Sequence, residues 1–210
     1  MFTGLVMGVA RIERVEPLAG NEGGVRLSLD AGAVPGFAAE VGDSIALNGA
    51  CMTATTVNGA RFTVDVSRES LSKTAGLDAA GEVNVETSLR LGDKLGGHLV
   101  SGHVDGIGIV QTMAPVAESW ELVVRAPRDL GRFMAYKGSV AVNGVSLTVN
   151  RVTDVADSAG ADGGCDISIN IIPHTHQVTT LRLLQPGSRV NLEIDLIARY
   201  VERMLAAPRD

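Results

Sequence analysis

Four short motifs occur twice in this chain, in the same order, and this repeat limits the possible folds more than any other feature of the sequence. The pairs are residues 3–8 with 101–106, 48–53 with 143–148, 62–67 with 167–172, and 83–86 with 190–193. A repeat of this kind indicates one supersecondary unit that is built twice. We therefore expect two copies of one small fold, with a first domain over residues 1–97 and a second over 98–194.

The second copy carries an insertion, because the separation between matching motifs widens after the second pair. The insertion falls at residues 155–164, where Gly, Ala and Asp predominate, and this composition is typical of turns. We expect the tip of a mobile hairpin there, and whether it is ordered stays open. Cys165 lies at its edge, and we interpret it as an unreactive hairpin cysteine.

Each copy has the pattern of an antiparallel sheet. Glycine makes up 25 of the 210 residues and separates short runs rich in Val, Ile and Thr at intervals of roughly ten residues. Runs such as 44–47 and 139–142 show the alternation of half-buried strands rather than of βαβ units. About six short strands in ~90 residues, without a helix long enough to cover a sheet, bury their apolar side best by closing into a barrel. The expected fold is all-β, with two similar six-stranded antiparallel β-barrels.

One segment lies outside the repeat, at residues 195–210. Its apolar residues follow the spacing of an amphipathic helix over 195–205, and Asp195 is placed to cap the N-terminus of that helix. Two alternatives remain open at this stage. The helix can fold back on its own barrel, or it can form a contact between subunits.

The charge balance excludes several classes of partner. The chain has 18 Lys and Arg against 24 Asp and Glu, a formal net charge of −6, and no basic stripe offsets that balance. A surface for nucleic acid or for anionic membrane is therefore not expected. No apolar run approaches the roughly 18 residues of a membrane span, and the N-terminus lacks the basic region of a secretory signal. We expect a cytoplasmic protein.

The two cysteines, Cys51 and Cys165, are too far apart in sequence to suggest a disulfide framework, and they lack the paired spacing of a zinc site. Reduced thiols are the expectation. His98, His103, His174 and His176 have no recognised metal-binding spacing either. We therefore predict no metal site.

Three motifs carry a resemblance to a known family. They are residues 1–6 (MFTGLV), residues 97–103 (GHLVSGH), and the paired motif Asn-Gly-x-(Cys/Ser)-x-Thr at 48–53 and 143–148. Over nearly the whole chain they closely resemble the riboflavin synthases of the alpha-chain type, a lumazine-binding repeat family. The resemblance implies a pair of Greek-key barrels, a C-terminal helix that forms a homotrimer, and an enzyme without a cofactor. The main departure is the insertion at 155–164.

The resemblance also implies a reaction, the last step of riboflavin biosynthesis. Two molecules of 6,7-dimethyl-8-ribityllumazine dismutate, and one transfers a four-carbon unit to the other. The products are riboflavin and 5-amino-6-ribitylaminopyrimidinedione. Two like substrates suit two like barrels, and a site between the N-terminal barrel of one subunit and the C-terminal barrel of another would make the transfer effectively intramolecular. The expected partners are this small molecule and further copies of the chain, whereas an association with lumazine synthase cannot be decided from the residues.

The resemblance implies which residues bind the two lumazines. The N-terminal pocket would comprise Gly4, Leu5, Val6, Cys51, Met52, Thr53, Asp65, Val66, Ser67, Arg68, Glu69 and Ser70. The C-terminal pocket would comprise Gly102, His103, Val104, Ser146, Leu147, Thr148, Asn170, Ile171, Ile172, Pro173, His174 and Thr175, with Lys137 reaching the ligand of a neighbouring subunit.

Simple chemistry is consistent with these pockets. Backbone groups beside glycine can pair with the pyrimidinedione edge, while the hydroxyls of Thr53 and Thr148 add orientation. Asp65 and Asn170 are candidates for the ribityl hydroxyls. Without the resemblance, each of these polar residues is more readily explained as the cap of a turn.

Catalytic residues are expected where the copies differ, because identical barrels cannot make one lumazine the donor and the other the acceptor. Cys51 aligns with Ser146, and His103 aligns with Leu5. A histidine, with a reference pKa of ~6.5, can accept the acidic proton of the C7 methyl group, and a cysteine, with a reference pKa of ~8.5, offers a thiolate nucleophile. Ser44 is a third candidate. The alternatives are a small core cysteine and a structural histidine.

Two other functions compete with catalysis. A homologue that binds lumazine or flavin without turnover would keep both barrels, although the joint presence of Cys51, Ser44, His103, Ser146 and Thr148 favours the enzyme. A two-barrel binder of oligosaccharides or oligonucleotides is disfavoured by the negative charge and by an aromatic content of only 3%, because such surfaces stack sugars or bases on aromatic rings.

Overall fold

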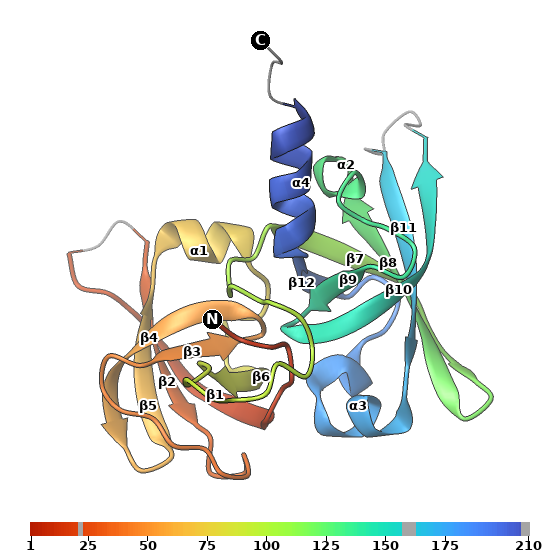
Figure 1. Cartoon of the computed structure of the whole chain (residues 1–210). Helices are drawn as coiled ribbons and strands as arrows, with labels where there is room; N and C mark the ends of the chain where they lie inside the picture. The colour runs from red at the N-terminus through yellow and green to blue at the C-terminus, as the bar shows by residue number, and fades with distance from the viewer. Residues whose placement is uncertain (21–22, 157–162, 207–210) are drawn as a thin grey trace.

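Twelve strands form two closed antiparallel barrels in the computed structural model, which describes residues 1–20, 23–156 and 163–206 (Figure 1). The first barrel contains β1 (Gly8–Pro17), β2 (Val25–Asp30), β3 (Ser44–Leu47), β4 (Ala50–Asn58), β5 (Arg61–Val66) and β6 (Gly81–Thr87). The second contains β7 (Gly106–Val116), β8 (Ser119–Pro127), β9 (Ser139–Val142), β10 (Val145–Val155), β11 (Gly164–Ile171) and β12 (Arg189–Ile194). The predicted all-β fold with two six-stranded barrels is confirmed.

Both barrels have one topology. In the first, the strand order is β1-β2-β5-β4-β3-β6, and the second has the corresponding order β7-β8-β11-β10-β9-β12. Because β2 lies beside β5 rather than β3, the chain makes the crossing of a Greek key in each copy. The register of β4 with β5 shifts at Ala54, and that of β10 with β11 shifts at Val149, so even the β-bulges are repeated.

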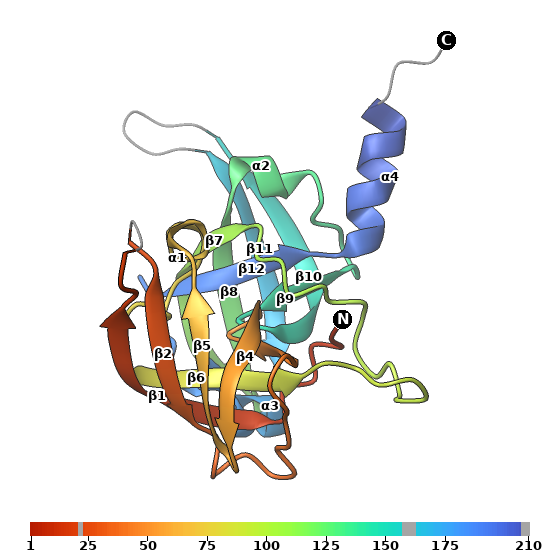
Figure 2. The same ribbon diagram turned by 90° about the vertical axis from the view of Figure 1, so that its left-hand side faces the viewer.

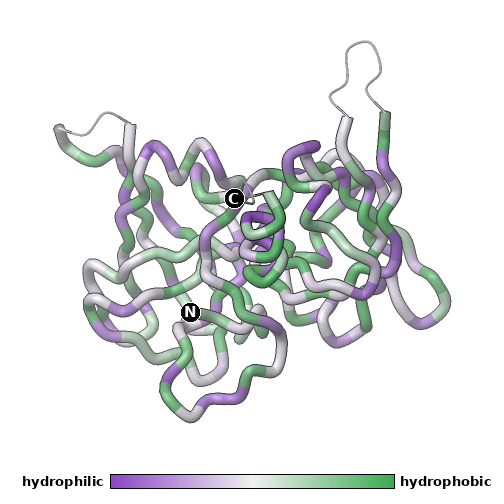
Figure 3. Tube along the Cα trace, turned by 45° about the horizontal axis from the view of Figure 1, so that its top comes forward, coloured by the Kyte–Doolittle hydropathy of each residue, from purple (hydrophilic) through white to green (hydrophobic). Residues whose placement is uncertain are grey.

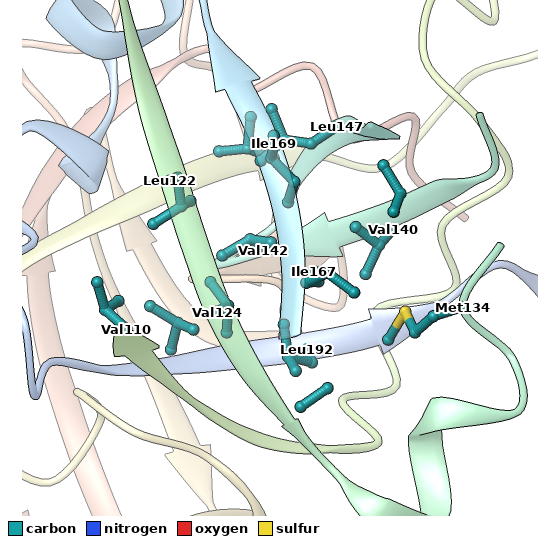
Figure 4. Close-up of a cluster of buried hydrophobic side chains, with 14 of the residues drawn as sticks. Val110, Leu122, Val124, Met134, Val140, Val142, Leu147, Ile167, Ile169 and Leu192 are labelled. Atoms are coloured by element: carbon teal, nitrogen blue, oxygen red, sulfur yellow. The ribbon is translucent and has the colours of Figure 1, made fainter. Parts of the chain in front are cut away.

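Alternation along the strands builds two separate cores. In β5 every second residue is buried, which places Phe62, Val64 and Val66 inside the first barrel. The second core includes Ile167 and Ile169 of β11, whose side chains point into the barrel together with those of the neighbouring strands (Figure 4). Apolar and polar residues accordingly alternate along the strands when the chain is coloured by hydropathy (Figure 3).

The tight turns use the residues that their backbone requires. The β3–β4 and β9–β10 hairpins turn at Asn48-Gly49 and Asn143-Gly144, and all four residues have a positive φ between 45° and 84°. Asn-Gly is the favoured pair for a two-residue hairpin turn, since this turn needs a positive φ at both positions.

Short helices follow matching strands of the two barrels. Helix α1 (Arg68–Lys73) comes after β5 and α3 (Pro173–Val178) after β11, while α2 (Arg128–Gly131) and the 3₁₀ turn η1 (Thr180–Leu183) have no described counterpart in the first barrel. Figure 1 shows α1 at the top of the first barrel and α3 at the bottom of the second, as expected for copies related by an approximate two-fold axis.

The predicted C-terminal helix is confirmed as α4 (Leu196–Ala206). The Asp195 carboxylate caps it by accepting a hydrogen bond from the Ile197 backbone N–H at 2.9 Å. The helix does not fold back on its barrel: it projects away from it, and none of its residues is buried (Figures 1 and 2). Two ion pairs connect the helix to the rest of the chain, Arg199–Asp105 at 2.7 Å in its first turn and Arg132–Glu202 at 2.9 Å further along.

Three further expectations concern Cys165, the insertion at 155–164 and the domain boundary, and each has a different outcome. Cys165 is fully buried in β11, where burial raises the pKa of its thiol, so it packs as an unreactive residue. Residues 157–162 of the expected hairpin tip lie outside the described residues. The division of the chain at residue 97 stays a prediction.

Among the described residues, no helix combines the length and the apolar composition that crossing a membrane requires.

Candidate functional site

The two barrels meet at their Asn-Gly turns. A Cβ atom placed on Gly49 would lie 2.7 Å from the backbone N of Gly144, and the reverse contact is also 2.7 Å, so neither position accepts a larger residue. Buried asparagines join the barrels around this contact. Asn84 Nδ2 donates to the Asn143 carbonyl at 2.9 Å, and Asn191 Nδ2 donates to the Asn48 carbonyl at 3.0 Å.

The two glycine segments cross between the barrels. The Gly102 carbonyl, from the segment that precedes the second barrel, accepts a hydrogen bond from the Cys51 N–H of the first barrel at 2.8 Å. The Gly4 carbonyl accepts in the same way from the Ser146 N–H of the second barrel, also at 2.8 Å. Each glycine has a positive φ, and a Cβ atom there would lie 2.6 Å from the Cβ atom of Cys51 or Ser146. Both contacts therefore depend on glycine.

The crossing bears on the expected grouping of the pockets. Residues 4–6 were expected beside Cys51 and residues 102–104 beside Ser146, whereas in the structure Gly4 pairs with Ser146 and Gly102 with Cys51. The physical reason is that each glycine segment, which precedes the first strand of its own barrel, crosses the contact between the barrels and pairs with the other barrel. A repeat shows which residues correspond, but it does not show which copy they contact.

A cavity of about 270 Å³ lies beside Cys51. The residues that line it are Ala50, Cys51, Met52, Glu69, Ser70, Lys73, Thr74, Gly102, His103 and Val104. Two of the expected catalytic residues, Cys51 and His103, therefore line one cavity. Ser44, the third, lines a different hollow of about 350 Å³ with Asp43, Thr87 and Arg90.

Lys73 was not among the expected site residues. It lies in the last turn of α1 and lines the Cys51 cavity, and its side chain makes no hydrogen bond or ion pair with the described part of the chain. Its position in the helix was a usable signal. The Ser67 hydroxyl caps α1 by accepting from the Ser70 N–H at 3.0 Å, which places Ser70 and Lys73 one turn apart on the same face.

The sequence analysis considered His98 only as a metal ligand, but the structure places it beside Ser146. His98 Nδ1 and the Ser146 hydroxyl are 2.7 Å apart, and His98 Nε2 is buried with no hydrogen-bond partner among the described residues. Burial lowers the pKa of this imidazole, which favours its neutral form. A neutral imidazole at this distance can accept the proton of a hydroxyl group.

Within residues 1–20, 23–156 and 163–206, no three His, Cys, Asp or Glu side chains come close enough together to hold a metal ion. Charged and titratable side chains also line the site. In the cavity of the first barrel these are the cation of Lys73, the carboxylate of Glu69, and His103.

The two residues expected to bind the ribityl hydroxyls, Asp65 and Asn170, already have hydrogen-bond partners within the protein. Asp65 forms a two-pronged ion pair with Arg26, at 2.7 and 2.8 Å, and this hydrogen bonding lowers the pKa of the carboxyl group. The Asn170 side-chain carbonyl accepts from the Ser119 hydroxyl at 2.7 Å. These contacts leave further lone pairs on the Asp65 carboxylate and both N–H donors of the Asn170 amide for a ligand.

Lys137 occupies an unusual backbone position. Its φ is 63°, whereas Gly42, which makes the matching backbone hydrogen bond in the first barrel, has a φ of 94°. A residue other than glycine in this region costs on the order of 1–2 kcal/mol. The Lys137 ammonium group donates to Asn150 Oδ1 at 2.9 Å and is exposed. The strained backbone indicates that the side chain, rather than the turn, is the reason for a lysine here.

The remaining expected residues divide by exposure. Val66, Leu147 and Ile171 are core residues, and their side chains are buried. Side chains with exposed or partly exposed surface belong to Leu5, Val6, Thr53, Ser67, Arg68, Thr148, Ile172, Pro173, His174 and Thr175. Thr53 and Thr148 occupy matching positions on β4 and β10, each paired with a serine of the neighbouring strand, Ser44 and Ser139.

Comparison with known proteins gives a consistent result. The family model of the lumazine binding domain matches residues 3–88 and again 101–195. The riboflavin synthase of Mycobacterium tuberculosis (strain ATCC 25618 / H37Rv) is 38% identical over 209 residues, which is 98% of each chain. That of Brucella abortus (strain 2308) is 37% identical over 97% of this chain and 98% of its own.

Solved structures show the same fold. LumP complexed with riboflavin has a TM-score of 0.74 at 22% identity, and it covers 92% of this chain and 99% of that chain. LumP complexed with 6,7-dimethyl-8-(1'-D-ribityl) lumazine has a TM-score of 0.71 at 21% identity, with the same coverage. At these identities the likeness establishes the architecture of two barrels.

Proposed function

We propose that this chain, which belongs to the riboflavin synthase family of lumazine-binding proteins, catalyses the dismutation of two molecules of 6,7-dimethyl-8-ribityllumazine. One observation carries this function: the similarity to riboflavin synthases spans both repeats and almost the full length of both chains. The products are riboflavin and 5-amino-6-ribitylaminopyrimidinedione, which makes the protein a transferase in the last step of riboflavin biosynthesis.

The reaction moves a four-carbon unit from one lumazine to the other and balances without an external oxidant. The donor and the acceptor are the same compound, so one ring is taken apart while a new ring closes on its partner. Positioning of the two rings therefore contributes much of the rate. Holding two reactants in contact can contribute ~7–11 kcal/mol in favourable geometries.

Each barrel binds one lumazine, and the crossing of the glycine segments sets the composition of each pocket. In the first barrel, Cys51, Met52, Thr53 and residues 65–70 act with residues 102–104. In the second, Ser146, Leu147, Thr148 and residues 170–175 act with residues 4–6. The hydrogen bonds of the Gly4 and Gly102 carbonyls to the opposite barrels support this assignment.

The two pockets have different chemistry. In the first, Cys51 is the nucleophile or acid–base group and His103 moves the C7-methyl proton, because both line one cavity. In the second, the hydroxyl of Ser146 is paired with the buried His98. Ser44 acts with Thr53 at the outer end of the first pocket, next to its own hollow.

The active form is a homotrimer held by α4. Ile197, Tyr200, Val201, Met204 and Leu205 are between 49% and 77% exposed and form one stripe along the helix. A stripe with this spacing is typical of a helix that packs on other helices. Trimer formation brings an N-terminal barrel against a foreign C-terminal barrel, where Lys137 reaches the neighbouring ligand. The cytoplasm is the proposed location.

The deciding experiment follows the absorbance of the purified full-length chain mixed with 6,7-dimethyl-8-ribityllumazine. Loss of lumazine with stoichiometric growth of riboflavin, one formed for every two consumed, is expected. A stable spectral shift without turnover would identify a binding protein instead. No spectral change at all would overturn both functions.

A further inference from the structure

Two buried carboxylates hold the crossing segments in place. We call residues 3–7 the first strap and residues 101–105 the second strap. Glu86 of β6 accepts three hydrogen bonds from the first strap, from the Thr3 N–H and hydroxyl at 2.7 Å each and from the Gly4 N–H at 3.0 Å. Glu86 is only 7% exposed, and burial raises the pKa of its carboxyl group.

Glu193 of β12 makes the matching contacts to the second strap. It accepts from the Ser101 N–H and hydroxyl at 2.6 Å each, and from the Gly102 N–H at 2.9 Å. Glu193 is 3% exposed. Each strap is therefore held by its own barrel, although its glycine carbonyl pairs with the other barrel.

The second strap has an additional anchor at Asp105. One carboxylate oxygen of Asp105 accepts from the Ile194 N–H at 2.9 Å, and the other accepts from Arg199 of α4 at 2.7 Å. The matching residue of the first strap is Met7, whose sulfur accepts only a weak hydrogen bond from Thr87 at 3.4 Å. The second strap thus has a charged anchor at each end, while the first has one.

His103 lies between these two anchors. Its side chain is exposed, lines the Cys51 cavity, and makes no hydrogen bond or ion pair with the described residues, so its position depends on the strap. Charge-assisted hydrogen bonds are shorter and roughly twice as strong as neutral ones, and they fix direction as well as distance. The first strap carries Leu5 at the equivalent place, and an apolar contact needs less accurate placement than a proton transfer.

We propose that Glu193 and Asp105 are positioning residues that hold His103 at the cavity it shares with Cys51, and that Arg199 connects this arrangement to the C-terminal helix. The inference rests on the proposed function, in which His103 moves a proton of the lumazine. Neither acidic residue lines the cavity. Their role is to place His103 for the proton transfer.

The test measures kcat and KM for the full-length chain across pH, with Glu193→Gln as the main variant. The amide replaces one acceptor oxygen by a donor, so the second strap loses a hydrogen bond while the volume stays the same. We expect kcat to fall about 10²-fold, the effect of a displacement near 1 Å, with KM changed less than about three-fold. The pH dependence of kcat near neutrality should flatten, as in His103→Ala. The other titratable groups of the cavity, Cys51, Glu69 and Lys73, stay in place in each variant.

Glu86→Gln is the matched control, because it makes the same change in the strap that carries Leu5. It should keep the pH dependence due to His103, whatever it does to kcat. A double-mutant cycle then separates positioning from stability. In the His103→Ala background, Glu193→Gln should reduce kcat by no more than about two-fold.

Two outcomes overturn the proposal. One is a wild-type kcat and pH profile in folded Glu193→Gln, and the other is an equal loss of kcat in the presence and absence of His103. If Glu193→Gln does not fold, Asp105→Asn and Arg199→Gln test the second anchor. Each should reduce kcat about ten-fold in the wild-type background and by no more than about two-fold in the His103→Ala background. Inactive wild-type protein overturns the proposed function along with this inference, whereas active wild type with unaffected variants overturns this inference alone.

Discussion

The two barrels share their architecture but differ in the side chains around their ligand pockets. The features that maintain the fold occur twice: the Asn-Gly turns, the buried asparagines, the glycine carbonyls and the buried glutamates. The residues that can react occur once. Cys51 corresponds to Ser146 and His103 to Leu5, and Lys73 at the end of α1 corresponds to Val178 at the end of α3.

This division indicates what duplication allows. Two copies supply two binding sites for one substrate, and the two-fold contact between them requires that the glycine and asparagine positions stay equal. The reaction requires the opposite, because a donor and an acceptor must be treated differently. We therefore expect the reacting residues among the positions that differ between the two copies, such as Cys51 and His103.

Removal of α4 should have the largest effect on this comparison. A chain that ends at Asp195 keeps both barrels and should bind ligand, but it should sediment as a monomer and lose turnover by more than about 10³-fold, since the pockets of different subunits no longer face each other. Sedimentation velocity and the riboflavin assay measure the two effects. Full-length Arg199→Gln controls for the lost ion pair. A truncated monomer with full specific activity over a wide dilution range would place the chemistry within one chain.

Cys51→Ala tests the difference between the two Asn-Gly motifs. Turnover should fall by about 10²-fold or more, while lumazine binding by calorimetry survives, because the variant removes a reacting group and leaves the backbone contact to Gly102 intact. Ser146→Ala is the matched change in the second barrel and should alter the partner of His98 instead. Near-normal turnover of Cys51→Ala would remove the thiol from the mechanism.

Exchange of the residues after the two glycines sharpens the comparison further. His103→Leu gives the second strap the side chain of the first, and it should lower kcat about ten-fold or more and flatten the pH dependence of kcat near neutrality. Leu5→His is the complementary variant and should not restore that dependence in the absence of His103, because the preceding Gly4 pairs with Ser146 rather than with Cys51. An unchanged pH profile in His103→Leu would make this histidine a structural residue.

The smallest expected effect concerns the backbone strain at Lys137. Lys137→Gly gives the second barrel the residue that the first has at Gly42, and relief of the positive φ should raise the free energy of unfolding by about 0.5–1 kcal/mol. Urea denaturation measures this change. Turnover should decline in the same variant because the ammonium group is lost. A stability unchanged or lowered by the glycine would show that the packing of the lysine outweighs the strain.

Much of the fold could be predicted from local patterns. Strand alternation, the Asn-Gly turns and the capped amphipathic helix each depend on residues close together in the chain, and the structure has all three where the sequence indicated them. Cys51, Met52, Glu69 and Ser70 were correctly expected to lie near one another, since β4 and the start of α1 belong to one barrel. The motif at 83–86 and 190–193 was recognised as a repeat, but no pattern in it indicated that Glu86 and Glu193 hold the straps.

What the sequence by itself determined is the unit and its duplication, because hydrophobic periodicity and turn chemistry act over a few residues. Only the tertiary structure decided which copy of each motif contacts which. Gly4 meets Ser146, Gly102 meets Cys51, and His98 reaches the Ser146 hydroxyl. In a repeated sequence the direct and the crossed pairings use the same residue types and the same local conformations. The choice between them rests on how two closed barrels pack around a shared axis, and this packing depends on contacts between residues far apart in the chain.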